Sequence, residues 1–336
     1  MNALLDQPSL FASLVERFFV DRLMSQKNAS PRTVESYRDT FRMIFRYAQK
    51  QLCKPPVRFT LNDFNSKLIL AFLNHLEKDR RNSIRSRNAR LAALHSFSRY
   101  VSTECPPAVH LAQRILDIPM KRFDKPPLVF LSREEIIALL SAPGTDSWFD
   151  QRDRLLLAML YNTGARISEI IAIRVSDVTL GSSSYVQLHG KGRKLRTVPL
   201  WKETATQVRQ WVKTHNLQPD KPLLPNRHGH AMTRANAADR FALALSKAAK
   251  KCPQLRGRHI SAHSVRHTVA QHLLREGVDI TVIALWLGHE SLTSTHGYIE
   301  ADLAMKERAL SSISPPSAKG KRYHPSDSLV SFLQSL

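Results

Sequence analysis

The chain has 336 residues, and at about 150 residues per domain this length predicts two domains, each large enough to bury its own core. Hydrophobic residues make up 43% and charged residues 23% of the chain, which excludes wholesale disorder. Only three cysteines occur, widely spaced, and no apolar run approaches the roughly 20 residues of a membrane helix. These features exclude a disulfide framework and a CxxC metal site, and we expect a cytoplasmic protein without membrane contact.

The charge balance is strongly basic. The 50 Lys and Arg residues outnumber the 28 Asp and Glu residues, which leaves a formal charge of +22. The excess is spread evenly, since residues 1–125 and residues 126–336 each carry +11. Such a field favours a polyanion, most often a nucleic acid. We therefore expect both parts of the chain to contact phosphate groups, the alternative being a generally cationic surface.

The first third of the chain shows helical periodicity. Apolar spacing predicts helices over residues 10–24, over the residues after the Ser30-Pro31 pair, and over residues 66–76 and 83–101. Ser30 is a favourable N-cap, and a proline is tolerated in the first turn because its missing N–H is not needed there. The outer side of the last of these helical regions is expected to carry six arginines: Arg80, Arg81, Arg85, Arg87, Arg90 and Arg99. This stripe is either a solvated face or a DNA-tracking surface, and we predict DNA contacts from Arg81, Arg85, Arg87 and Arg90.

Prolines mark the boundary between the two domains. Pro119, Pro126 and Pro127 surround a polar stretch, which predicts an extended linker because proline disfavours helix in the residue before it. Near the end of the chain, a second stretch is rich in proline, serine and lysine. We predict a helical domain over 1–117, a linker over 118–129, a catalytic domain over 130–313 and a flexible tail over 314–336.

The second domain begins with a helix and contains a hairpin. Ser132-x-x-Glu135 is a capping box, and the apolar run from Leu155 to Tyr161 predicts a buried helix that ends at Gly164. Residues 185–189 and 195–198 predict two strands around the sequence Gly190-Lys-Gly-Arg-Lys194. Helical periodicity then returns over 234–250, 263–275, 281–287 and 302–312. The predicted class is mainly α with a small antiparallel sheet.

Several residues together meet the needs of phosphodiester cleavage without a metal, namely a nucleophile, cations for the phosphate oxygens and an acid for the leaving oxygen. Arg166 follows the glycine that ends one helix. His263 and Arg266 are one helical turn apart and so share a face. The other candidates are Lys191 in the hairpin, His289 after Gly288, and Tyr298 nine residues further on.

The order and spacing of these residues over 131–312 resemble the tyrosine recombinases, that is, the phage-integrase and Xer-type site-specific recombinases. The resemblance implies a two-domain DNA clamp with a helical SAM-like core-binding domain at the N-terminus and an α+β catalytic domain. It also implies that Tyr298 attacks the scissile phosphate and forms a 3′-phosphotyrosine with release of a 5′-hydroxyl, with no ATP and no cofactor. By the same resemblance, the supporting residues are Arg166 and Arg266 for the non-bridging oxygens, Lys191 as the acid, His263 as the acid/base partner and His289 as a phosphate contact.

Other parts of the sequence extend or complicate this resemblance. We expect Arg193 and Lys194 of the hairpin to contact DNA, and Glu169 is a weaker candidate for orienting Arg166. The family often continues the tyrosine with a small or hydroxyl residue and then histidine, whereas this chain has Ile299-Glu300, which bears on local electrostatics more than on the nucleophile.

Alternatives remain for individual residues and for the whole protein. His263 and His267 have the spacing of a metal pair, but no third ligand accompanies them, so we expect no metal. Tyr323 is a rival nucleophile outside the motif. A mobile-element integrase or transposon recombinase is preferred over Xer-like dimer resolution, a type IB topoisomerase or a non-catalytic DNA-binding protein.

The end of the chain suggests assembly on double-stranded DNA. A stripe of Leu329, Phe332, Leu333 and Leu336 is too short to form a stable helix alone and is expected to dock on another surface. The resemblance implies docking on a neighbouring subunit in a tetramer that holds two DNA duplexes. Docking of the tail on its own domain is the alternative.

Overall fold

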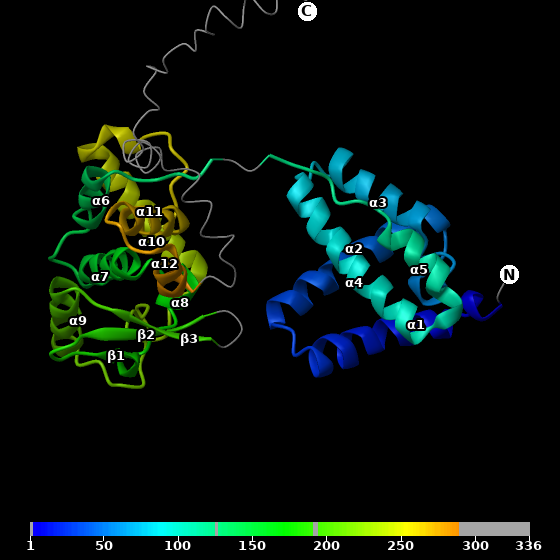
Figure 1. The fold of residues 1–336 in the computed structure, drawn as a ribbon, viewed down its shortest axis with the longest axis horizontal. Helices are drawn as coiled ribbons and strands as arrows, with labels where there is room; N and C mark the ends of the chain where they lie inside the picture. Colours follow the sequence, from blue (N-terminus) through cyan, green and yellow to red (C-terminus); the bar gives the residue numbers. More distant parts are fainter. Residues whose placement is uncertain (1–2, 125–126, 191–193, 289–336) are drawn as a thin grey trace, which may run out of the picture. The chain divides into compact units, whose positions relative to one another are not determined.

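The computed structural model describes residues 3–124, 127–190 and 194–288 (Figure 1). The chain divides into two compact units, residues 1–126 and residues 127–336, and each unit is described by itself. In the described residues, α-helices predominate and the strands form one three-stranded antiparallel sheet. The predicted class, mainly α with a small antiparallel sheet, is confirmed. No helix in these ranges is both long and apolar enough to cross a bilayer.

The first unit is helical. Ser30 accepts a hydrogen bond from the backbone N–H of Thr33, so the predicted N-cap of the second long helix is confirmed. The predicted helix over residues 10–24 is instead an α-helix that continues directly into a π-helical segment. The elements are η1 Ala3–Asp6, α1 Pro8–Arg17, π-helical η2 Phe18–Gln26, α2 Pro31–Leu52, η3 Pro56–Arg58, α3 Ser66–Lys78, α4 Ile84–Glu104, η4 Pro106–Ala108 and α5 Val109–Leu116.

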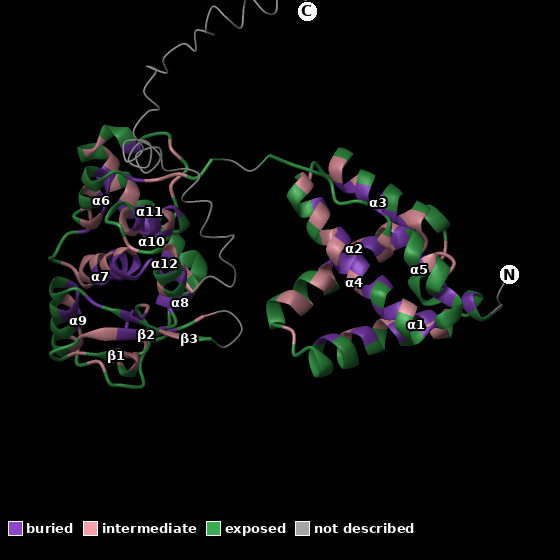
Figure 2. Ribbon diagram, viewed as in Figure 1, coloured by how far each residue is buried: buried purple, intermediate pink, exposed green. Residues whose placement is uncertain are grey.

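Aromatic rings form the centre of the first unit. Phe97 of α4 is fully buried, and its ring centroid lies 5.2 to 6.2 Å from those of Phe11, Phe18, Phe41 and Phe64. All four pairs are edge-to-face, an arrangement that aromatic quadrupoles favour. Figure 2 shows the resulting buried stripes on α2 and α4. This apolar core leaves the polar helix faces at the surface of the unit.

The chain stays attached to the first unit beyond its last helix. Ile118 is buried in the core, and the Asn88 side chain donates to the carbonyl of Lys121 and accepts from its N–H. Arg87 donates to the carbonyl of Pro119. Residues 118–121, which the sequence places in the linker, are therefore held against α4.

The second unit combines helices with the sheet. The predicted capping box of Ser132 and Glu135 is present, and the helix after it ends near residue 140. The elements are α6 Arg133–Leu140, α7 Trp148–Thr163, α8 Ile167–Ile170, η5 Val175–Asp177, β1 Val178–Thr179, β2 Tyr185–His189, β3 Leu195–Pro199, α9 Lys202–Thr214, α10 Arg234–Lys251, η7 Pro253–Leu255, α11 Ala262–Arg275 and α12 Ile280–Leu287. The predicted helix over 302–312 lies outside the described residues.

Apart from short 3-10 turns, two α-helices and one strand of the described residues were not predicted. Helix α5 follows two prolines, which occupy its preceding 3-10 turn rather than an extended segment. Helix α9 buries Thr204, Ala205, Val208 and Trp211, which recur at helical spacing, so a signal for this helix was present in the sequence. Strand β1 has two residues, too few for an alternation pattern.

The hairpin packs one face against the helices of this unit. Its strands pair antiparallel with Leu188 opposite Arg196, in the order β1-β2-β3. Val186, Leu188 and Val198 are fully buried. Helix α7, next to α9 and α11, ends at Gly164 as predicted. This packing places the ends of α7, α12 and the hairpin around α8.

Candidate active site

The turn between α7 and α8 presents Arg166. Gly164 adopts a left-handed conformation with φ of +59°, which ends α7, and Arg166 occupies the N-cap position of α8. Glu169 accepts hydrogen bonds from the backbone N–H of Arg166 at 2.9 Å and from its Nη1 at 2.8 Å. Among the described residues, only Glu169 accepts a hydrogen bond from this guanidinium. About a third of the Arg166 side chain is exposed, so the side chain is both held by Glu169 and partly open to solvent.

Glu169 is buried between two arginines. Its Oε2 accepts a 2.6 Å hydrogen bond from Nη2 of Arg196 on β3, while Oε1 faces Arg166. Burial alone raises the pKa of Glu169, but the hydrogen bonds and charges of Arg196 and Arg166 outweigh it and lower the pKa below its ordinary value. Glu169 is therefore an anion that holds two guanidinium groups in place.

Arg266 of α11 joins the ends of two other helices. Its side chain is only 1% exposed. Nη1 donates to the carbonyl of Gly164 at 2.9 Å, and Nη2 donates to the carbonyl of Leu287 at 2.8 Å. These carbonyls belong to helix C-termini, where intrahelical donors are lacking. Arg266 thus fixes α11, the α7 terminus and the α12 terminus to one another.

Two histidines lie one turn apart on α11. The rings of His263 and His267 meet edge to face with centroids 4.5 Å apart. Burial, followed by the positive charges of Arg266, Arg166 and Arg234, lowers the pKa of His263. Burial, His263 and Arg266 lower the pKa of His267 to about 4. Both rings are therefore neutral near neutral pH, and a neutral imidazole can accept a proton.

The described ends of two further segments meet at Arg196. A Cβ atom on Gly190 would lie 3.5 Å from Nη1 of Arg196 and 3.7 Å from Oε1 of Glu169. A Cβ atom on Gly288 would lie 3.0 Å from the same Nη1. In the sequence, Lys191 follows Gly190 and His289 follows Gly288. Four predicted site residues, Lys191, Arg193, His289 and Tyr298, lie outside the described residues.

The structure brings Arg166, His263 and Arg266 together, and it adds Arg196, which the sequence reasoning missed. A signal for Arg196 was present in the strand pattern. Val198 is an inward-facing residue of β3, and Arg196, two positions earlier, must face the same way. An arginine at an inward-facing position needs an anionic or carbonyl partner, and Glu169 and Trp286 supply both.

The predicted DNA-binding arginines of the first unit differ in exposure. Arg81 and Arg85 are exposed, as is Lys194 in the second unit. Arg87 is 3% exposed and pairs with Glu77, so its predicted place on the outer face is wrong. It faces inward because α4 is packed on several sides. Arg90 is half-buried and donates to the carbonyl of Ser36 and the hydroxyl of Thr40 in α2.

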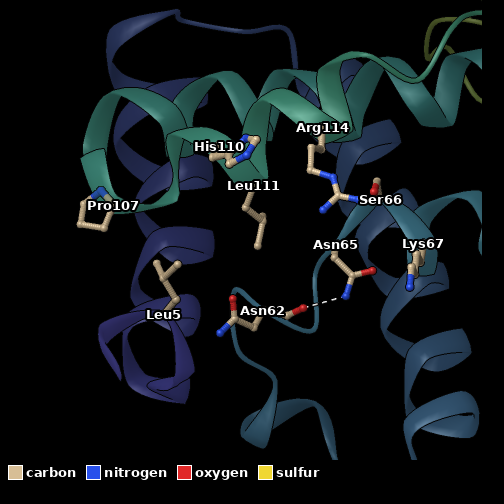
Figure 3. Close-up of a pocket in the computed structure, with 9 residues that line it drawn as sticks. All are labelled: Leu5, Asn62, Asn65, Ser66, Lys67, Pro107, His110, Leu111 and Arg114. Carbon is tan, nitrogen blue, oxygen red and sulfur yellow. Dashed lines mark hydrogen bonds between the residues drawn. The ribbon is translucent and has the colours of Figure 1, made fainter. Parts of the chain in front are cut away.

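One cavity of the first unit is lined by other residues than the predicted catalytic ones. Figure 3 shows a pocket of about 410 Å³ in the first unit, between the start of α3 and α5. Its lining includes Asn62, Asn65, Lys67, His110 and Arg114, and Asn65 donates to the carbonyl of Asn62. None of the predicted catalytic residues lines this pocket. Within the described ranges, no three His, Cys, Asp or Glu residues are grouped as metal ligands.

Comparisons with known families match both units. The model of the Phage integrase family matches residues 129–305. The model of the phage integrase N-terminal SAM-like domain matches residues 16–104. The described residues of the candidate active site lie within the first match, and the aromatic centre of the other unit, apart from Phe11, lies within the second.

Individual relatives cover nearly the whole chain. An integrase/recombinase of Sinorhizobium fredii, y4rC, is 43% identical over 325 residues, which are 97% of this chain and 98% of that protein. Tyrosine recombinase XerC of Chlamydia muridarum is 30% identical, with 86% of this chain and 94% of that protein covered.

Solved structures share the fold at lower identity. XerH bound to its difH substrate has a TM-score of 0.66 and 20% identity, covering 93% of this chain and 90% of that one. The Tn1549 transposon integrase in complex with transposon end DNA has a TM-score of 0.65 and 16% identity, covering 88% of this chain and 98% of that one. From the family matches and the full-length relatives, the chain belongs to the phage integrase family and is a tyrosine-type site-specific DNA recombinase.

Proposed function

We propose that the chain cuts and rejoins double-stranded DNA through a 3′-phosphotyrosine at Tyr298. The observation that carries this proposal is the convergence of Arg166, His263 and Arg266 around one short turn. The residues that precede Lys191 and His289 lie at the same place. A site of this composition supplies cations for a phosphate and groups that exchange protons, without a metal.

The two arginines would hold the non-bridging oxygens of the scissile phosphate. Arginine suits this role because its planar fork stays charged and binds phosphate through two parallel hydrogen bonds. Arg166 is held by Glu169 and is about a third exposed, which would leave part of its guanidinium for the phosphate. Arg266 brings a second positive charge from α11. Both charges stabilise the extra negative charge that develops on phosphorus during attack.

Proton transfer would accompany each bond change. Tyr298 Oη forms a bond to phosphorus and gives up its proton, for which His263 is the acceptor, since its lowered pKa keeps the ring neutral before the reaction. The bond from phosphorus to the 5′ oxygen breaks, and Lys191 gives that oxygen a proton. His289 donates a hydrogen bond to the phosphate. A 5′-hydroxyl from the partner strand reverses these steps, and no ATP is needed because one phosphodiester replaces another.

Both units would contact DNA phosphates. The even division of charge, +11 in each part, supports this. Arg81 and Arg85 are the exposed candidates in the first unit, and Lys194, with Arg193, is the candidate in the second. Arg90 has intramolecular acceptors in α2, so we give it a smaller share of DNA binding than the exposed arginines.

Assembly would involve a tetramer on two duplexes. One structure of the same fold, with a TM-score of 0.61, is a lambda integrase tetramer bound to a Holliday junction. The apolar stripe of residues 329–336 would dock on a neighbouring subunit. Deleting residues 328–336 is expected to weaken synapsis and spare single-site binding, as measured by gel shift. Unchanged recombination by the truncated protein would contradict docking between subunits.

The biological setting would be a mobile element. The 43% identity to an integrase/recombinase over nearly full length supports this role. Dimer resolution is the second candidate, because XerC of Chlamydia muridarum matches over 94% of its length. Plasmid assays separate the two. Intermolecular integration favours the mobile-element role, whereas resolution confined to direct repeats favours dimer resolution.

The nucleophile is tested with a library of nicked duplexes of randomised sequence. The full-length protein should trap a subset of them as covalent adducts that survive detergent and EDTA, and sequencing the trapped DNA identifies the site. Tyr298→Phe should trap none, and Tyr323→Phe, which removes the rival hydroxyl, should trap the same DNA as wild type. Adducts formed by Tyr298→Phe would overturn the nucleophile assignment. Relaxation of supercoils without joint molecules would indicate a topoisomerase.

A further inference from the structure

We propose that Arg196 is a positioning residue for strand cleavage, which sets the place of the hairpin that carries Lys191 relative to Arg166. This inference rests on the proposed function and adds a residue to it. Arg196 lies on β3, opposite Leu188, and only 11% of its side chain is exposed. Its polar contacts are with Glu169 and the carbonyl of Trp286, so it acts through other elements of the fold.

The guanidinium of Arg196 connects three elements. Nη2 donates to Oε2 of Glu169 in α8 at 2.6 Å, and Nε donates to the carbonyl of Trp286 in α12 at 3.0 Å. Arg196 itself belongs to the hairpin. One planar group thus fixes the hairpin to α8 and to the last turn of α12. Lysine, with a single nitrogen, cannot reproduce two bonds in this fixed orientation.

Two glycines, Gly190 and Gly288, lie against the Arg196 guanidinium. At Gly288, an added Cβ would lie 3.0 Å from Nη1 and 3.2 Å from Cδ of Arg196. At Gly190, it would lie 3.5 Å from Nη1. Gly190 also closes the base of the hairpin loop, because its N–H donates to the carbonyl of Lys194 at 2.8 Å. The guanidinium therefore lies directly against the residue that precedes Lys191.

Glu169 transmits this position to Arg166. Oε1 of this buried carboxylate binds the Arg166 guanidinium, and Oε2 binds both the Arg196 guanidinium and the backbone N–H of Arg166. A displacement of Arg196 consequently moves the hairpin with respect to the residue that would hold the phosphate. Because a misplacement of about 1 Å in a catalytic group lowers rates by about 100-fold, the connection is expected to affect proton delivery from Lys191.

The test uses Arg196→Lys in the full-length protein and two versions of the suicide duplex recovered by adduct trapping. One version has the natural 5′ oxygen at the cleaved bond, and the other has sulfur there. A thiol has a pKa of about 8.5, so a thiolate leaves without needing a proton, whereas an alkoxide does need one. The measured quantity is the single-turnover rate of adduct formation. Arg209→Lys, on the exposed face of α9, is the matched control.

Arg196→Lys is expected to slow cleavage of the oxygen substrate by about 100-fold and of the sulfur substrate by less than about 10-fold, with DNA affinity unchanged. Arg209→Lys should match wild type on both. An unchanged rate for Arg196→Lys on oxygen, or an equal loss on both substrates, would overturn the inference. Lys191→Ala tests the proposed function separately. If this variant cleaves the sulfur substrate no faster than the oxygen substrate, the role of Lys191 as the acid is wrong.

A second variant guards against loss of folding. Removing the charge of Arg196 alone leaves Glu169 buried without one of its partners, which destabilises a fold. The double variant Arg196→Gln with Glu169→Gln removes both charges. We expect it to unfold near the wild-type urea midpoint. Its rate of adduct formation should still be higher on the sulfur substrate than on the oxygen substrate. A folded double variant that cleaves both substrates at the wild-type rate would also overturn the inference.

Discussion

Gly164 offers a quantitative test of how the site is packed. It has a φ of +59°, and a Cβ atom placed on it would lie 2.6 Å from Cδ2 of Leu287 and 3.1 Å from Cγ1 of Val269. Real Cβ atoms essentially never approach other atoms to 2.6 Å. The substitution Gly164→Ala therefore introduces both backbone strain and a clash between the ends of α7 and α12.

The expected cost has two parts. A left-handed conformation costs an L-residue about 1–2 kcal/mol, of which the stiffer unfolded chain offsets about 0.4–1 kcal/mol. Overpacking in a filled core costs about 1–3 kcal/mol. We therefore expect Gly164→Ala to lower the free energy of unfolding by about 1–5 kcal/mol in total.

Alanine variants of two other glycines in the same unit separate the cost of backbone strain from the cost of overpacking. Gly229 has a φ of +79° but open space around its Cβ position, so Gly229→Ala reports strain alone. Gly181 has open space and no positive φ, so Gly181→Ala reports neither part. All four tryptophans lie after residue 126, so urea unfolding followed by tryptophan fluorescence reports the second unit specifically. A loss of stability in Gly164→Ala no larger than that in Gly229→Ala would refute the packing argument.

Three further predictions concern other residues. Arg85→Ala should reduce the salt dependence of DNA binding by about one counterion, as measured by fluorescence polarisation. Arg87→Ala should leave this salt dependence unchanged, because the side chain is buried. It should instead lower the urea midpoint of the first unit, as followed by circular dichroism. Because the pKa of His267 falls from 6.5 unfolded to about 4 folded, the unfolded state binds the extra proton, and stability should fall as the pH drops from 6.5 towards 4. His267→Gln should flatten that fall in urea midpoints, and an unchanged curve would contradict it. Ser132→Ala should cost about 1 kcal/mol by removing an N-cap, read from tryptophan fluorescence.

Local signals in the sequence predicted most of the elements. The Ser30 cap, the capping box of Ser132 and the stop at Gly164 depend on groups within a few residues of one another, so they are readable without a fold. Helix α9 was missed although its buried residues, among them Val208 and Trp211, recur at helical spacing. Arg87 was misplaced because α4 is packed by α2, α3 and α5, and a single apolar stripe does not describe such a helix.

Charge, hydrogen-bonding capacity and local helix signals belong to individual residues and short segments, so the chemical groups available and their order along the chain can be read without a fold. Which of these groups meet depends on the folded chain. Arg196 is bound to Glu169 and to the carbonyl of Trp286, partners 27 and 90 residues away in the sequence. Such pairs form only when the burial of apolar faces brings distant segments together, since the free energy that fixes their distance comes from the packing of the whole unit.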